Sequence, residues 1–241
     1  MKIDRNLILN KLTESLEALN YVNALWLEGA DSLDTVDEFS DIDVWVDVED
    51  GKELEVIKVF RSALMEIGEL DFDYEKDHGH PKIRQHFFHI IDTSKFLIVD
   101  LCVQANSRVF WFTEGKEGEK VKVLFDKKNV INFKPLDQKK FEKEVIDRKK
   151  YLEGEFRIMK VDVEKELERN DYLGALNFYL SLASIFTELQ RIEHIPTKHE
   201  FGLKHASRDL PRATRDMICL IYTFSVIDDL RRNIDLMSQN I

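Results

Sequence analysis

Apolar residues recur every three or four positions over residues 3–20, a spacing that predicts an amphipathic helix. Strand patterns follow at 21–27 and 42–48, and a second helical pattern covers 52–67, where Gly68 ends it. The remaining strand patterns of this part of the chain lie at 70–74, 83–91, 96–104 and 121–125, with turn residues at 77–81 and 92–94.

The pattern changes near Leu136, after which long and densely charged helical repeats replace the strands. We expect helices over 137–169 and 172–192, and one final helix that follows Pro211 and runs through Leu230. The fold class is therefore predicted as α+β. A domain with a mixed sheet covers 1–138, and a helical bundle domain covers 139–241.

Carboxylates alternate with apolar residues on the second predicted strand, where Asp41 and Asp43 flank Ile42. Residues i and i+2 share one face of a strand, so both carboxylates project together and repel unless a cation lies between them. Mg²⁺ is the hard cation that accepts carboxylate oxygens and accompanies phosphate substrates. Asp100 lies inside the apolar run 96–103, where a buried charge needs a partner.

The order of these motifs carries a family resemblance. A strand ends at Gly29-Ala30, about ten residues intervene, and Ser40-Asp41-Ile42-Asp43 begins the next strand, with Asp100 on a later one. This arrangement resembles the nucleotidyltransferases of the DNA polymerase β superfamily, and the branch of the aminoglycoside and lincosamide nucleotidyltransferases is nearest. The resemblance covers residues 21–104.

The resemblance implies an enzyme that transfers a nucleoside monophosphate from a nucleoside triphosphate to a hydroxyl of a small molecule, with an aminoglycoside or lincosamide as the expected type of acceptor. Pyrophosphate leaves, and two Mg²⁺ ions, replaceable by Mn²⁺, stabilise the charge that develops. By this resemblance Asp41 and Asp43 bridge both ions, while Asp100 binds the ion beside the attacking hydroxyl and helps to remove its proton. The expected site lies in a cleft between the two domains.

Nucleotide contacts are expected at the turn that begins with Gly29 and Ala30, whose backbone N–H groups would face the phosphates. The family has serine directly after the glycine, where this chain has Ala30, and Ser32 is the expected substitute. Ser40 is a further expected contact. Asp34 replaces a small residue and brings negative charge close to the phosphates.

These departures keep a second hypothesis open, in which a decayed transferase fold senses nucleotides or binds a protein. A third hypothesis keeps the chemistry and takes a protein hydroxyl as the acceptor. Nothing in the sequence separates the third hypothesis from the first.

Basic residues form an island in the helical region, at Lys198, Lys204, Arg208 and Arg212. We interpret the island first as a solvated helix face. The alternative is contact with the triphosphate, with Lys204 and Arg208 as the first candidates.

Four histidines, His78, His80, His86 and His89, have no spacing typical of a closed zinc site and are interpreted as surface and strand residues. Arg84 and His86 share a strand face. The alternative for this pair is an approach to a phosphate or to the acceptor.

Composition narrows the class of protein. The 241 residues are 44% hydrophobic and 34% charged, with no apolar run long enough for a membrane helix and no secretory signal pattern, so a cytoplasmic protein is expected. A net charge of −11 disfavours nucleic acid and favours cationic small molecules. Cys102 and Cys219 are predicted as reduced core residues. Apolar faces of the predicted bundle would also allow two chains to pair as a homodimer.

Overall fold

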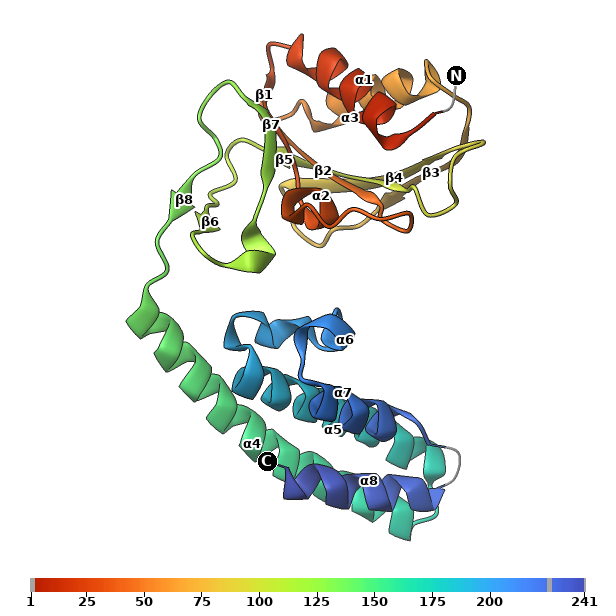
Figure 1. Cartoon of the computed structure of the whole chain (residues 1–241), viewed down its shortest axis with the longest axis vertical. Helices are drawn as coiled ribbons and strands as arrows, with labels where there is room; N and C mark the ends of the chain where they lie inside the picture. Colours follow the sequence, from red (N-terminus) through yellow and green to blue (C-terminus); the bar gives the residue numbers. More distant parts are fainter. Residues whose placement is uncertain (1–2, 225–226, 241) are drawn as a thin grey trace. The chain divides into compact units, whose positions relative to one another are not determined.

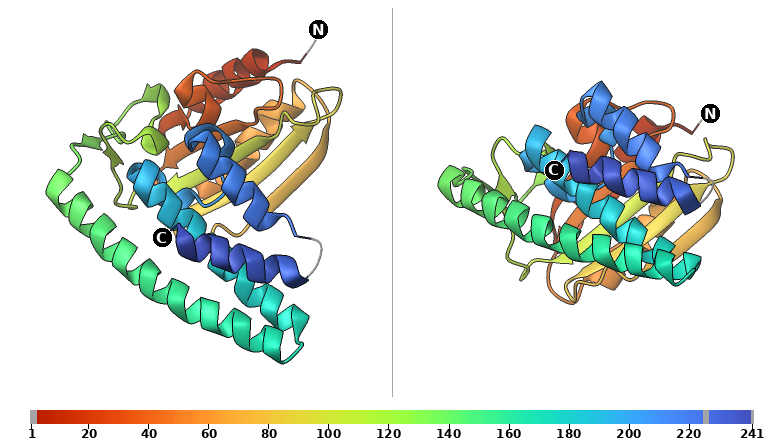
Figure 2. Two further views of the ribbon diagram at one scale, coloured as in Figure 1. Left: turned by 60° about the horizontal axis from the view of Figure 1, so that its bottom comes forward. Right: turned by 90° about the horizontal axis from the view of Figure 1, so that it is seen from below.

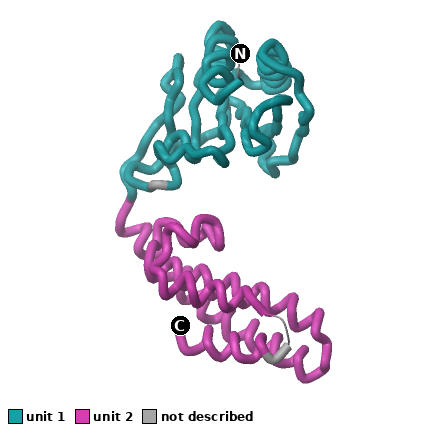
Figure 3. Tube along the Cα trace, turned by 45° about the vertical axis from the view of Figure 1, so that its right-hand side comes forward, with its two compact units in different colours: residues 1–136 teal, residues 137–241 magenta. Residues whose placement is uncertain are grey.

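The computed structural model describes residues 3–224 and 227–240. It divides into two compact units, Met1–Leu136 and Asp137–Ile241 (Figure 3). The first unit is a mixed sheet with helices, and the second is helical (Figure 1). The predicted α+β fold class is therefore confirmed.

The first unit is built on a six-stranded sheet in the order β3-β4-β5-β2-β1-β7. β2 and β5 pair in parallel and the other neighbours are antiparallel, so the sheet is mixed as predicted. Its strands are β1 (Val22–Leu27), β2 (Ile42–Val48), β3 (Leu70–Lys76), β4 (Ile83–Ile90), β5 (Val99–Ala105) and β7 (Lys122–Asp126).

Two helices, α1 (Arg5–Glu17) and α3 (Glu53–Met65), lie together on one face of this sheet (Figure 1). Asp4 begins α1, where its side chain accepts a hydrogen bond from the Leu7 N–H at 2.9 Å. The apolar residues of these helices and of the sheet face beneath them form the main core of the first unit. Full burial of each Leu, Ile or Phe side chain contributes about 1.5–3 kcal/mol to the free energy of unfolding. The helices bury Ile8, Leu12, Leu16, Val56, Ile57, Phe60 and Leu64 against alternate strand residues such as Ile42, Val44, Val99 and Leu101.

The opposite face of the sheet carries polar and aromatic side chains, because the strands alternate. On β2 this face presents Asp43, Trp45 and Asp47. Asp47 is fully buried and accepts amide hydrogen bonds from Asn23 at 2.8 Å, Gln104 at 2.7 Å and Asn106 at 2.9 Å. Its carboxylate is thus satisfied by side chains of neighbouring strands. A small aromatic cluster covers part of the face, with Trp26, Trp45, Phe110 and Phe112.

Several short elements of the first unit have too few residues to show a sequence pattern. They are the helix α2 (Gly29–Leu33), the 3₁₀ turn η1 (Glu117–Glu119) and the parallel pair β6 (Phe112–Thr113) and β8 (Phe133–Lys134). Of these, only the helical turn after Gly29 was predicted.

The second unit is organised by a long helical hairpin of α4 (Gln138–Glu168) and α5 (Tyr172–His194), which lie side by side in Figures 1 and 2. Asn170, in the left-handed conformation with φ 58°, separates the two helices. Asp171 begins α5 by accepting from the Gly174 N–H at 2.9 Å. The unit continues with η2 (Pro196–Phe201), α6 (Ala206–Asp209), α7 (Arg212–Tyr222) and α8 (Ile227–Gln239).

The prediction of one final helix after Pro211 is wrong. Within the described residues, this part of the chain forms two helices, α7 and α8, because Thr223 is extended with φ −110° and ψ 107° and ends the first. Residues 225 and 226 lie outside the described residues. Tyr179 joins the two helices to α5, since its hydroxyl donates to the Ile221 carbonyl at 2.6 Å and accepts from the Asn233 amide at 3.0 Å.

No helix among residues 3–224 and 227–240 combines the length and the apolar character that crossing a lipid bilayer requires.

The two cysteines differ in exposure, so the prediction that both belong to the core is wrong for one of them. Cys102 on β5 is buried, and burial raises the pKa of its thiol. Cys219 on α7 is exposed, since it faces away from the buried residues Ile218 and Ile221.

This difference predicts the thiol chemistry of the native protein. One thiol is expected to react rapidly with Ellman's reagent, and Cys219→Ser is expected to abolish that reaction. Cys102 is expected to react only after denaturation, because it is buried and protonated. Two rapid thiols in the native protein would contradict the burial of Cys102.

Candidate active site

The turn that follows β1 comes into contact with β2. The N–H of Glu28 donates to the Asp43 carbonyl at 3.1 Å, and the next residue, Gly29, has φ 59°. A Cβ at position 29 would lie 2.0 Å from Oδ2 of Asp43. Glycine is therefore required both by the backbone conformation and by the carboxylate that lies against it.

Replacement of Gly29 by alanine is expected to lower the free energy of unfolding by about 2 kcal/mol or more, because the left-handed conformation and the Cβ clash both cost energy. It should also displace the Asp43 carboxylate. Gly51→Ala is the matched control, since Gly51 has φ 83° and no atom within 4 Å of the added Cβ. Thermal unfolding of both variants measures the difference, and equal destabilisation would contradict the close approach to Asp43.

Two of the predicted carboxylates lie on neighbouring strands. Asp43 on β2 is directly opposite Asp100 on β5 in the parallel register, and adjacent strands are about 4.8 Å apart. Gln85 on β4 donates its Nε2 to both oxygens of Asp100, at 2.8 and 2.9 Å. Burial raises the pKa of Asp100, the negative charge of Asp41 acts in the same direction, and the hydrogen bond from Gln85 opposes both.

The third carboxylate, Asp41, lies one residue before β2 and is exposed. Its backbone is fixed by Arg5 of α1. The guanidinium of Arg5 donates to the carbonyls of Ser40 at 2.5 Å and Asp41 at 2.8 Å, and forms an ion pair with Asp31 of α2 at 2.5 Å. Arg5 thus joins α1, α2 and the start of β2 next to Asp41, a role that the sequence pattern did not indicate.

The donor chemistry of this face suits a hard divalent cation, because Asp41, Asp43 and Asp100 supply only carboxylate oxygens. Among the described residues, however, no three His, Cys, Asp or Glu side chains are gathered closely enough to hold an ion as they stand. A metal at these carboxylates therefore remains a prediction.

Hydroxyl and carbonyl groups of the turn after β1 make local hydrogen bonds. The hydroxyl of Ser32 donates to the Gly29 carbonyl at 2.8 Å, and that of Ser40 donates to the Asp37 carboxylate at 2.8 Å. The carbonyl of Ala30 accepts from the Thr35 N–H at 3.1 Å. These bonds shape the segment 29–40, and contact of its residues with a nucleotide stays a prediction.

Sequence reasoning missed a further carboxylate, next to Asp43, on this face of the sheet. Glu28 follows β1 and accepts a hydrogen bond from the Trp26 indole N–H at 3.0 Å. Burial raises the pKa of Glu28, while that hydrogen bond and the charge of Arg108 lower it. Arg108 lies over the ring of Trp45, 5.7 Å from its centroid. Glu28 is two residues after Trp26, and this same alternation could have indicated its place beside Asp43.

The alternative role of Arg84 and His86 near a phosphate or the acceptor is not supported, because both point to the other face of β4. Arg84 pairs with Glu75 at 2.6 Å, and His86 is buried with its ring stacked on Phe88. Gln85, between them, points toward Asp100 instead.

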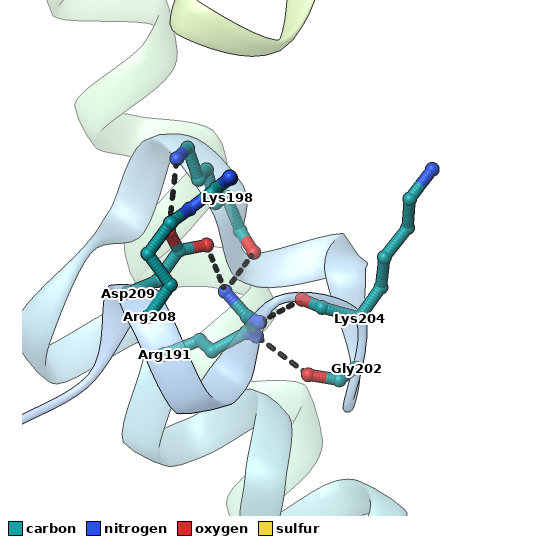
Figure 4. Close-up of polar contacts among 6 residues, drawn as sticks. All are labelled: Arg191, Lys198, Gly202, Lys204, Arg208 and Asp209. Carbon is teal, nitrogen blue, oxygen red and sulfur yellow. Dashed lines mark hydrogen bonds and ion pairs between the residues drawn. The ribbon is translucent and has the colours of Figure 1, made fainter. Parts of the chain in front are cut away.

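In the second unit, the interpretation of the basic island as a solvated helix face holds for Arg208 of α6 and Arg212 of α7, whose side chains are exposed. It is wrong for Lys198, which is only 4% exposed and lies in η2. It pairs with Asp209 at 3.2 Å (Figure 4). Burial alone would raise the pKa of Asp209. The hydrogen bond from Lys198 and the charges of Lys198 and Arg208 outweigh burial and hold that pKa below its ordinary value.

Arg191 of α5 organises the same cluster (Figure 4). Its fully buried guanidinium donates to the carbonyls of Gly202 at 2.6 Å and Lys198 at 3.4 Å, and also to that of Lys204. It also lies 3.5 Å from the carboxylate of Asp209. One side chain thus holds the segment that connects η2 to α6.

Lys204 and Arg208, the predicted triphosphate contacts, belong to this segment. The backbone of Lys204 is held by Arg191, and its side chain is exposed and extends away from the cluster (Figure 4). The side chain of Arg208 is 50% exposed beside Asp209. Their contact with a nucleotide stays a prediction.

No family model and no curated protein matches this sequence. Among solved structures, the chain is similar to the spectinomycin adenyltransferase AAD(9) from Enterococcus faecialis, crystallised with ATP and spectinomycin, at 12% identity over 98% of both chains with a TM-score of 0.36. It is also similar to JHP933 from Helicobacter pylori, at 12% identity over 99% of this chain and 92% of the other with a TM-score of 0.32.

A third similar structure is a candidate nucleotidyltransferase from H. pylori, at 11% identity over 99% of this chain and 95% of the other, with a TM-score of 0.31. TM-scores this low carry no argument about chemistry, so the function proposed below depends on the side chains of the chain itself.

Proposed function

We propose that the first unit carries the active site of a nucleotidyltransferase, which transfers a nucleoside monophosphate from a nucleoside triphosphate to a hydroxyl of a small molecule. The observation that carries this proposal is the position of Asp43, which lies directly opposite Asp100 and against the turn at Gly29. This reaction needs two parts, which are a pair of adjacent carboxylates and a turn whose backbone can approach phosphates.

In the proposed reaction, the acceptor hydroxyl oxygen bonds to the α-phosphorus, the bond from that phosphorus to the bridging oxygen breaks, and pyrophosphate leaves with the electron pair. Asp100 accepts the proton of the hydroxyl, and Gln85 holds its carboxylate in place. The backbone at Gly29 and Ala30 receives the β- and γ-phosphates.

Asp41, Asp43 and Asp100 are the residues that would hold Mg²⁺, or Mn²⁺ in its place. When bound, the two ions would neutralise the charge that develops on the transferring and leaving oxygens.

The test is pyrophosphate release by the purified full chain with Mg²⁺, each of the four ribonucleoside triphosphates, and a panel of hydroxyl acceptors. The panel includes kanamycin, spectinomycin and lincomycin. Release that depends on the acceptor supports the proposal. The proposal would be contradicted if the protein neither released pyrophosphate with any member of the panel nor bound any of the triphosphates.

A second candidate function is nucleotide sensing without turnover. Ala30 and Asp34 favour it, since the first lacks a hydroxyl for the phosphates and the second adds a negative charge near them. Calorimetric titration with ATP and Mg²⁺ separates the two candidates. Binding without pyrophosphate release would support the sensor, and release would exclude it.

A further inference from the structure

Beyond Asp100, the face of the sheet that carries the carboxylates continues into exposed aromatic residues. Phe87 on β4 is the register partner of Asp100, and Tyr74 on β3 is the register partner of Phe87. Paired residues on adjacent strands project to the same face. Asp43, Asp100, Phe87 and Tyr74 therefore form one row across β2, β5, β4 and β3.

The aromatic end of this row is open. Tyr74 is 54% exposed and its neighbour Phe72 is 44% exposed, while Phe87 is half-buried. The next residue along on β4, Phe88, points to the opposite face, where it is fully buried in the core. The Nζ of Lys76 lies 5.9 Å from the centroid of the Phe87 ring, so this lysine is part of the same surface.

The geometry of the proposed reaction indicates which reactant lies over this surface. The attacking and leaving oxygens lie roughly in line through phosphorus. In the function proposed above, pyrophosphate leaves toward Gly29, which lies on the β1 side of Asp43. The hydroxyl must then arrive from the other side of Asp100, over β4 and β3.

We infer that Phe87 and Tyr74 form the binding surface for the acceptor, and that the acceptor is a hydroxylated ring, such as a sugar or cyclitol, whose apolar face stacks on these two aromatic rings. This inference rests on the proposed function. A ring stacked there brings a hydroxyl at its edge toward Asp100, the register neighbour of Phe87.

Kinetics of Phe87→Leu and Tyr74→Leu test the inference. Each variant is expected to raise the acceptor KM about five- to tenfold, with the triphosphate KM and kcat nearly unchanged, because an aromatic contact of this kind is worth about 1 kcal/mol. Trp111→Leu is the matched control, since this aromatic residue is also half exposed but lies outside the row. A rise in the triphosphate KM, or no change in either KM, would overturn the inference.

A binding measurement without turnover keeps the inference separate from the proposed function. In the protein with ¹³C-labelled Phe and Tyr rings, adding kanamycin, spectinomycin or lincomycin is expected to shift the resonances of Phe87 and Tyr74 and not that of Phe133. Asp43→Asn should reduce pyrophosphate release at least about a hundredfold and leave these shifts intact. If all three compounds at saturating concentration leave both rings unshifted, the inference fails whether or not the protein is a nucleotidyltransferase.

Discussion

Replacement of Asp43 by asparagine is expected to reduce pyrophosphate release at least about a hundredfold. Removing a group that only supports a metal ligand costs 10- to 100-fold, and Asp43 is proposed as a ligand itself. Asparagine has the same shape and keeps the contact with Gly29, so the change removes negative charge without opening space. The variant should therefore fold like the parent protein.

The control for this variant is Asp92→Asn, which removes one negative charge in the exposed turn after β4. Asp92 has φ 65°, a conformation that asparagine also tolerates. Mn²⁺ titration of both proteins, followed by electron paramagnetic resonance, gives a readout besides turnover. Weaker Mn²⁺ binding is expected only for Asp43→Asn. Unchanged pyrophosphate release in this variant would contradict the proposed function.

Replacement of Arg191 by methionine is expected to destabilise the second unit by about 3–5 kcal/mol, the usual cost of breaking a buried ion pair. Methionine fills part of the space but leaves three carbonyls and the Asp209 carboxylate without the guanidinium. Hydrogen exchange of the backbone amides of residues 196–210 measures the effect locally. Their protection should fall at least about a hundredfold.

Arg208→Met is the comparison, because this side chain is half exposed beside the same carboxylate and should cost less than about 1 kcal/mol. The depressed pKa of Asp209 adds a pH dependence. The contribution of this carboxylate to the free energy of unfolding is fully present when the pH is above the ordinary pKa of aspartate. It is lost as the pH falls through the lower pKa that the carboxylate has in the folded protein. Equal protection in Arg191→Met and Arg208→Met would contradict the organising role of Arg191.

Alternation along strands predicted much of the first unit, because each strand buries one face. The pattern of β2 placed Asp41 and Asp43 apart from Ile42 and Val44, and the apolar surroundings of Asp100 marked it as unusual. Register could not be predicted, since it depends on which strands pair. The sequence pattern therefore singled out Arg84 and His86 on β4, whereas the pairing of β4 with β5 directs Gln85 toward Asp100.

Long-range side-chain contacts escaped prediction for a similar reason. Arg5 and Arg191 are ordinary charged positions in helical patterns, and nothing local indicates that each binds backbone carbonyls of a distant segment. The end of α7 also lacks a sequence signal, since the residue that ends it is Thr223 and not a glycine or a proline. Apolar spacing continued across it and suggested a single helix.

The parallel pairing of β2 with β5 has a consequence for folding. Parallel neighbours cannot be joined by a hairpin, so α3, β3 and β4 all lie between Asp43 and Asp100 in the chain. Contacts of high sequence separation form late, after the local hairpin of β3 and β4. A nascent chain that has not yet emerged through β5 thus displays Asp43 without its counterpart, and the pair of facing carboxylates is completed only when the central strands close.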